Sequence, residues 1–264
     1  MRLQGRAAVV TGAGSGIGQA ICEAFVREGA AVVLGDIDGA AAERVAGALR
    51  EQGGRVLAVA GDVAQSATAV ELVARCAKAF GGVDIVVNNA GAVLQRPVVD
   101  LSDEDWDRML RVDLYGPFYG SREAMRAMVR QGRGGRIIQT SSLLAVQSRS
   151  LQSAYSAAKA GLIGFSRSLA IEAGPHGITV NCVLPGHIRT PLTEPMFTPP
   201  VRRAFEERIP LHRLGEAAWV ADVFVFLASD EGRYVTGQAI LVDGGYTISG
   251  ELPGLEFGPT SQEA

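Results

Sequence analysis

The sequence predicts an α/β fold: a doubly wound parallel sheet of about seven strands, with helices on both faces, in a three-layer sandwich. Short segments rich in Val, Ile and Ala alternate with longer segments whose apolar residues recur every three or four positions. Strands that alternate with helices in this way form parallel sheets. The strand segments also lack polar alternation, which is typical of strands covered on both faces.

The first strand is predicted over residues 6–10, and a glycine-rich turn and a helix follow it. Another long helix is expected from Ser102 toward Arg130, because Ser-Asp-Glu-Asp at its start resembles a capping box. The other predicted strands are 31–34, 55–60, 83–87, 136–140, 178–183 and 239–242, and the other helices are 38–51, 67–80, 154–173 and 217–228.

Residues 187–213 form the one long segment that we predict to be irregular. The segment contains five prolines together with apolar residues. A loop of this length in a compact domain is usually a lid or binding loop, although a disordered insertion is the alternative. We therefore divide the chain into one domain over 1–250, with a substrate lid at about 187–213, and a C-terminal tail over 251–264.

Composition and charge exclude several classes of protein. The chain has 264 residues and a net charge of -3, without a run of Lys or Arg, so neither a nucleic-acid nor a membrane-surface partner is predicted. No apolar run approaches the roughly 20 residues of a membrane span, and the N-terminus lacks the apolar region of a signal peptide. The three cysteines are widely spaced, which indicates no disulfide framework and no metal site. A cytoplasmic location is expected.

A glycine-rich turn between the first strand and helix predicts a dinucleotide site. Gly12, Gly16 and Gly18 follow the spacing G-x-x-x-G-x-G. Glycines at such a turn let the backbone approach a pyrophosphate, and the helix N-terminus adds free N–H groups. Read alone, the same turn is also compatible with a purely structural role.

Asp36, at the end of the second strand, predicts NAD rather than NADP. A carboxylate at this position accepts hydrogen bonds from the ribose hydroxyls of the adenosine and repels a 2′-phosphate. Ser15, Ile37 and Asp38 offer no cation to such a phosphate. A plain strand-end aspartate is the alternative.

Tyr155 and Lys159 are four residues apart in a predicted helix, so their side chains share a face. The ammonium beside the phenol favours the phenolate. An ionised tyrosine is a usable general base. The pair alone is weak, because Tyr-x-x-x-Lys also occurs on ordinary surface helices.

The motifs together resemble the short-chain dehydrogenase/reductase family, in its common branch of about 250 residues, over roughly residues 5–246. The resemblance implies a Rossmann-like NAD-binding fold. The motifs that carry it are Thr11-Gly-x-x-x-Gly16-x-Gly18, Asp62-Val63, Asn88-Asn-Ala-Gly91, Ser142, Tyr155-x-x-x-Lys159, Asn181-x-x-x-Pro185-Gly186-x-Ile188-x-Thr190 and Asp243-Gly-Gly245.

The resemblance implies a role for each matched residue. Ser142 would hold the substrate oxygen, Tyr155 would be the general acid/base, and Lys159 would assist the tyrosine and bind the nicotinamide ribose. It also implies a homotetramer. The residues expected at the NAD cofactor are Gly12, Ser15, Gly16, Ile17, Gly18, Asp36, Ile37, Asp62, Val63, Asn89, Ala90, Gly91, Tyr155, Lys159, Pro185, Gly186, Ile188 and Thr190.

Asp113 departs from the family pattern, which commonly has asparagine there to anchor a water that relays protons from the lysine. An aspartate has nearly the same shape. As an anion, it favours protonated Lys159 and opposes the phenolate. We expect Asp113 to keep the relay role with a shifted pH optimum; a simple bond to helix backbone or solvent is the alternative.

We expect an NAD-dependent enzyme that interconverts a secondary alcohol, such as a polyol or sugar, and its ketone. The substrate residues that we predict are Gln95, Leu144, Gln152, His187 and Met196. Two alternatives stand: a 3-oxoacyl-[acyl-carrier-protein] reductase, against which Asp36 argues, and a non-catalytic NAD-binding protein, against which the Ser142, Tyr155 and Lys159 set argues.

Overall fold

The computed structural model describes residues 1–249, so the predicted tail 251–264 lies outside the described residues. Seven parallel strands form the central sheet in the order β3-β2-β1-β4-β5-β6-β9, which confirms the predicted α/β fold class. The strands are β1 (Ala7–Thr11), β2 (Ala31–Asp36), β3 (Val56–Ala60), β4 (Ile85–Asn88), β5 (Gly135–Thr140), β6 (Ile178–Pro185) and β9 (Ala239–Val242).

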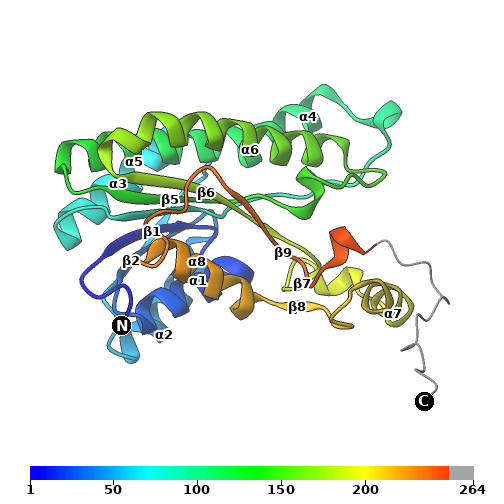
Figure 1. Ribbon diagram of the computed structural model, residues 1–264, viewed down its shortest axis with the longest axis horizontal. Helices are drawn as coiled ribbons and strands as arrows, with labels where there is room; N and C mark the ends of the chain where they lie inside the picture. Colours follow the sequence, from blue (N-terminus) through cyan, green and yellow to red (C-terminus); the bar gives the residue numbers. More distant parts are fainter. Residues whose placement is uncertain (250–264) are drawn as a thin grey trace, which may run out of the picture.

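Helices cover both faces of the sheet (Figure 1). On one face lie α1 (Gly16–Arg27), α2 (Gly39–Glu51) and α8 (Ala217–Ala228), and on the other lie α3 (Ser66–Phe80), α5 (Gly116–Gln131) and α6 (Ser153–Ala173). Successive residues of β1 enter opposite layers: Val10 belongs to the apolar cluster of Phe25 and Phe224, and Val9 belongs to that of Met128. Burial on both faces explains why the strands are apolar throughout.

The strand order places a crevice at one edge of the sheet. From β1 the chain runs outward to β3 and then crosses back to β4, which pairs with the other side of β1. Ligands of such sheets bind where the strand order reverses, at the carboxyl ends of the strands. Thr11 and Asn88 end β1 and β4 at this point.

The long helix predicted from Ser102 toward Arg130 is interrupted, so that prediction was wrong in its middle. The chain instead forms α4 (Asp103–Leu110), a π-helical turn (Arg111–Tyr115) and then α5. Pro117 has no N–H to donate to the carbonyl of Asp113, four residues earlier, so a regular α-helical ladder cannot continue here. The predicted cap is present, because the Ser102 side chain accepts a hydrogen bond from the Asp105 N–H at 3.1 Å.

The segment 187–213, predicted to be irregular, contains regular structure. It holds β7 (Ile188–Arg189), which pairs with β8 (Gly215–Glu216), and α7 (Pro199–Arg208). The prolines at the start of α7 occupy its first turn, where the missing N–H leaves no intrahelical bond unmade. Within residues 1–249, no helix is both long and apolar enough to cross a membrane.

Candidate active site

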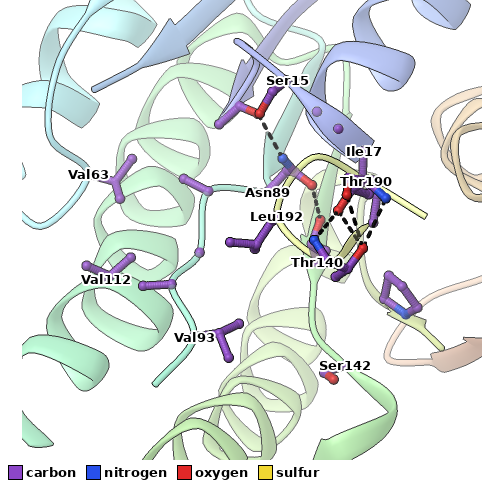
Figure 2. A pocket seen from close by; sticks show the side chains of 18 of the residues that line it. Ser15, Ile17, Val63, Asn89, Val93, Val112, Thr140, Ser142, Thr190 and Leu192 are labelled. Atoms are coloured by element: carbon purple, nitrogen blue, oxygen red, sulfur yellow. Dashed lines mark hydrogen bonds between the residues drawn. The ribbon is translucent and has the colours of Figure 1, made fainter. Parts of the chain in front are cut away.

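A cleft of about 510 Å³ lies at the carboxyl edge of the sheet, and part of it is drawn in Figure 2. All of the residues predicted to contact the cofactor line this one cleft, although they come from segments that are far apart in the sequence. Ser142 lines it too. The sequence did not single out several further lining residues, which are Gly61, Ala92, Val112, Thr140, Ser141, Pro191 and Thr193.

The glycine-rich turn that follows β1 forms part of the wall of the cleft. Gly12 has φ +64°, and a Cβ there would lie 2.8 Å from the Cα of Ala90, so both conformation and space require glycine. Helix α1 starts at Gly16, which leaves its first N–H groups without intrahelical partners beside the cleft. A turn without side chains lets a pyrophosphate approach the backbone, and the free N–H groups at the start of α1 can donate hydrogen bonds to it.

The Asp36 carboxylate is fixed at the edge of the cleft by two backbone donors. The N–H of Gly14 donates to Oδ2 at 2.8 Å, and the N–H of Asp38 donates to Oδ1 at 2.9 Å. Each carboxylate oxygen has a further lone pair for a ligand. Among the lining residues, all of them described, Lys159 is the only basic one. The 2′-phosphate that distinguishes NADP from NAD would therefore find no cation near Asp36 among these lining residues.

Asn89 ties the glycine-rich turn to β5. Its side-chain Nδ2 donates to the carbonyls of Thr11 and Gly12 at 3.0 and 3.2 Å, and its Oδ1 accepts from the Thr140 hydroxyl at 3.1 Å. Figure 2 shows Asn89 and Thr140 joined in this way. Thr140 ends the predicted strand 136–140, so its place at the carboxyl edge is the signal that could have identified it.

Tyr155 and Lys159 both lie on α6 and both face the cleft. The Lys159 Nζ is 5.6 Å from the centre of the Tyr155 ring and donates to the Thr140 carbonyl at 2.9 Å. The Ser142 Oγ accepts from the N–H of Leu144 at 3.1 Å, which leaves the hydroxyl hydrogen free to donate elsewhere.

Asp113 forms a direct, buried ion pair with Lys159. Its Oδ1 is 3.0 Å from the Lys159 Nζ, the two side chains are 0% and 3% exposed, and the N–H of Ala92 donates to the carboxylate at 3.3 Å. A Cβ at Gly91 would lie 2.8 Å from the Asp113 Oδ1, so glycine makes room for the pair. Asp113 itself does not line the cleft.

Burial and pairing act in opposite directions on these two groups. Burial raises the pKa of Asp113 above its ordinary value, against the attraction of Lys159. Burial by itself lowers the pKa of Lys159, but the Asp113 carboxylate and Tyr155 outweigh it, and the pKa of Lys159 is raised. Lys159 is therefore held as an ammonium at neutral pH.

The five predicted substrate residues do not line the cleft. The Gln95 Nε2 contacts the Met196 Sδ at 3.6 Å, and Gln152 is buried. Leu144 packs against the apolar cluster of Leu143, Ile209, Leu214 and Tyr246. His187 stacks on the ring of Phe205. Their contact with substrate stays a prediction. Within residues 1–249, no three His, Cys, Asp or Glu side chains are grouped so as to hold a metal ion.

Comparison with known proteins gives matches over almost the whole chain. A family model described as Enoyl-(Acyl carrier protein) reductase matches residues 12–247. The 3-oxoacyl-[acyl-carrier-protein] reductase FabG of Thermotoga maritima is 38% identical, over 94% of this chain and 100% of its own. L-rhamnose 1-dehydrogenase (NAD(P)(+)) of Azotobacter vinelandii is 40% identical, over 94% of this chain and 99% of its own. The crystal structure of levodione reductase is 32% identical with a TM-score of 0.90, over 94% of this chain and 100% of that chain.

Proposed function

The chain belongs to the short-chain dehydrogenase/reductase family, whose members act on CH–OH groups, and on that premise we propose that it uses NAD to interconvert a secondary alcohol and its ketone. A polyol, a sugar or a related hydroxy compound is the proposed substrate. The observation that carries the choice of cofactor is the fixed carboxylate of Asp36 at a cleft whose only basic lining residue among those described is Lys159.

The shape and donors of the cleft fit a dinucleotide. The glycine-rich turn and the start of α1 offer backbone N–H groups to the pyrophosphate, and Asp36 offers acceptors to the adenosine ribose. Asn89, Ile188 and Thr190 lie toward the nicotinamide end in this proposal. When bound, NAD accepts the hydride in oxidation and supplies it in reduction.

Three side chains carry out the chemistry that we propose for the protein itself. The Tyr155 phenolate takes the hydroxyl proton of the alcohol, and the phenol returns it in the reverse direction. The Ser142 hydroxyl donates a hydrogen bond to the substrate oxygen while negative charge develops there. The Lys159 ammonium lies beside the Tyr155 ring, 5.6 Å from its centre, where it assists the tyrosine.

Asp113 is proposed to take the place of the family asparagine and to keep its role in relaying protons from Lys159. The side chains are in direct contact at 3.0 Å, and Asp113 is supported by the backbone of Ala92. In this arrangement Asp113 holds Lys159 in place and raises its pKa, so that Lys159 stays an ammonium.

A 3-oxoacyl-[acyl-carrier-protein] reductase is the second candidate, because FabG of Thermotoga maritima matches 94% of the chain at 38% identity. Such reductases usually use NADPH. The Asp36 carboxylate argues against that cofactor, since it repels a 2′-phosphate. Cofactor preference therefore separates the two candidates.

The test is the dissociation constants of NADH and NADPH, measured by titration of cofactor fluorescence. We expect NADH to bind at least about tenfold more tightly, since one charge repulsion of about 1.4 kcal/mol gives this ratio. Asp36→Ser is expected to remove most of the preference. Asp38→Ser is the matched control, because serine still caps α2 and leaves the Asp36 side chain in place. Tighter binding of NADPH by the natural sequence refutes the NAD proposal.

We also propose a homotetramer in the cytoplasm. Exposed apolar side chains on and beside α4 and α5, among them Trp106, Tyr115 and Phe118, support an interface through this layer. The three cysteines are free and buried, as suits a reducing compartment. Light scattering after size-exclusion chromatography tests the assembly, and a monomer at micromolar concentration contradicts it.

A further inference from the structure

An aromatic cluster lies next to Ser142, outside the cofactor cleft. His187 stacks on Phe205 with ring centres 3.9 Å apart and meets Tyr246 edge-on at 4.5 Å. These rings come from the loop after β6, from α7 and from the segment after β9. Leu143 and Leu144, which directly follow Ser142, belong to the same apolar cluster as Phe205 and Tyr246.

Two guanidinium groups cover this aromatic cluster. The Arg149 Cζ lies 5.7 Å from the centre of the Phe205 ring, and the Arg208 Cζ lies 4.8 Å from the centre of Tyr246. A guanidinium above a ring keeps its edge N–H donors free. Burial and then the positive charges of Arg149 and Arg208 lower the pKa of His187 to about 4, so both charges act on this one side chain.

No acidic side chain within residues 1–249 neutralises these two arginines. The ion pairs formed by the described residues include neither Arg149 nor Arg208. Asp243 is the nearby acid, but its carboxylate already accepts from the N–H groups of Gly245 and Thr247 and from the Thr247 hydroxyl. Within the described residues, the charge of Arg149 and Arg208 is therefore open to solvent or a ligand.

A buried polar atom of the aromatic cluster lacks a partner. Within residues 1–249, the Nδ1 of His187 is buried without a hydrogen bond. The same holds for the Oε1 atoms of Gln147 and Gln152, which belong to the chain segment between Ser142 and α6 that carries Arg149. Buried polar atoms in native proteins are normally satisfied, so the Nδ1 of His187 has a place for a polar group of a ligand or for water.

Two turns that follow these arginines each contain a non-glycine residue with positive φ. Leu151 and His212 have φ +67° and +49°, and they are the only such residues within 1–249. Leu151 lies two residues after Arg149, and its carbonyl accepts from the N–H of Arg96 at 2.7 Å. His212 lies four residues after Arg208, beyond the end of α7. A left-handed backbone is uncommon for such residues, so their surroundings must fix these two turns.

We propose that Arg149 and Arg208 bind the carboxylate of the substrate, so that the substrate is a secondary alcohol or ketone with an apolar body and a carboxylate remote from the reacting carbon. This inference rests on the proposed function, because it assigns the substrate class of that same site. The apolar body lies against Leu144 and Phe205, and the carboxylate meets the guanidinium edges.

A carboxylate fits this place better than a phosphate monoester. Arginine binds carboxylates in a two-pronged geometry through parallel N–H donors. The surrounding side chains are mostly leucines and aromatic rings, and a single negative charge is less costly to transfer into such surroundings than a double one. A neutral polyol would leave both guanidinium groups unpaired.

The experiment measures binding without turnover, by calorimetry on the full chain with and without saturating NADH. The probes are matched pairs: cyclohexanecarboxylate with cyclohexanecarboxamide, and hexanoate with hexanamide, together with cyclohexyl phosphate. We expect the carboxylate of at least one pair to bind about tenfold more tightly than its amide, as charge-assisted hydrogen bonds imply. The double variant Arg149→Met with Arg208→Met is expected to lose this preference.

Matched variants separate the site from general surface charge. Arg203→Met removes another exposed arginine of α7 and is expected to keep the preference. The double variant Arg149→Lys with Arg208→Lys is expected to keep part of the preference for the carboxylate. Equal binding of acid and amide in both pairs, an unchanged preference in the double variant, or tighter binding of cyclohexyl phosphate than of the carboxylate overturns the proposal. Activity with NAD is measured separately, so failure here leaves the oxidoreductase assignment standing.

Discussion

The positive charges on the two sides of Ser142 differ in what neutralises them. Lys159 is buried and touches Asp113 at 3.0 Å, so its charge is balanced inside the protein. Arg149 and Arg208 lie over aromatic rings without an acidic partner among residues 1–249. A buried charge must be paired, whereas a partly exposed guanidinium is satisfied by water until a ligand arrives. The Lys159–Asp113 pair therefore suits a charge that stays in place throughout a reaction. The two arginines suit an anion that binds and leaves.

The largest expected effect tests the catalytic side. Tyr155→Phe is expected to lower kcat by about 10²–10⁴, the usual contribution of a general acid/base, because the proton acceptor is gone while the ring remains. Turnover of an accepted alcohol with NAD measures the loss. NADH binding, followed by fluorescence, is expected to be unchanged. A variant that keeps wild-type turnover contradicts the role of Tyr155.

Asp113→Ala tests whether Lys159 needs its internal partner. Loss of one member of a buried ion pair leaves the other charge uncompensated and lowers the free energy of unfolding by about 3–5 kcal/mol. Urea denaturation at one fixed protein concentration measures the change. Asp113→Asn is the matched control, since the amide keeps the shape and a hydrogen-bond acceptor, and a smaller loss is expected. Equal stability of Asp113→Ala and wild type contradicts the pairing.

The same pair predicts how stability depends on alkaline pH. The pKa of Lys159 in the folded protein lies above its ordinary value of 10.5, so its contribution to stability is complete below about pH 10.5 and is lost as the pH rises through the folded pKa. In Asp113→Asn, the carboxylate that raises the pKa of Lys159 most is gone, so this alkaline loss is expected to be smaller. Urea midpoints between about pH 9 and pH 12 distinguish the two proteins.

A smaller effect is expected on the pH dependence of alcohol oxidation. Asp113→Asn removes the negative charge that contacts Lys159, so the pH profile of kcat/KM is expected to shift. Profiles of wild type and variant, measured with the same alcohol, test this shift. Identical profiles leave Asp113 with a structural role alone.

The smallest expected effect concerns the arginines. The double variant Arg149→Met with Arg208→Met is expected to change the free energy of unfolding by no more than about 0.5 kcal/mol, because neither charge is paired within residues 1–249. Urea denaturation beside Asp113→Ala makes the comparison direct. A loss of several kcal/mol shows that the arginines stabilise the fold, and the contrast with Lys159 then fails.

The residues predicted to contact the cofactor all line one cleft, because they lie where strands end, and their contact with NAD stays a prediction. Gly12, Asp36 and Asn89 each follow or close an apolar strand segment, and parallel strands bring their carboxyl ends to one edge. Local pattern and topology therefore suffice for this part of the site.

Other parts could not be predicted from local pattern. The π-helical turn has no periodic signature, since the apolar spacing on both sides continues like one helix. Helix α7 was not predicted, because the five prolines of segment 187–213 favour a loop. The spacing of Arg202 and Glu206, at i and i+4, is the local pattern that favours a helix there. The contact of His187 with Phe205 and Tyr246 joins three distant segments, and only the tertiary structure brings them together.

The π-helical turn at Arg111–Tyr115 also limits which changes in chain length this region accepts. A turn of this kind holds one residue more than the α-helix around it. Deletion of one residue there would turn the π-helical turn into an ordinary α-helical one and leave α4 and α5 in nearly the same relative phase. Met109 on α4 is fully buried, and it would keep its place in the core. Related chains are therefore expected to tolerate the loss of one residue here more readily than a deletion inside α4 or α5.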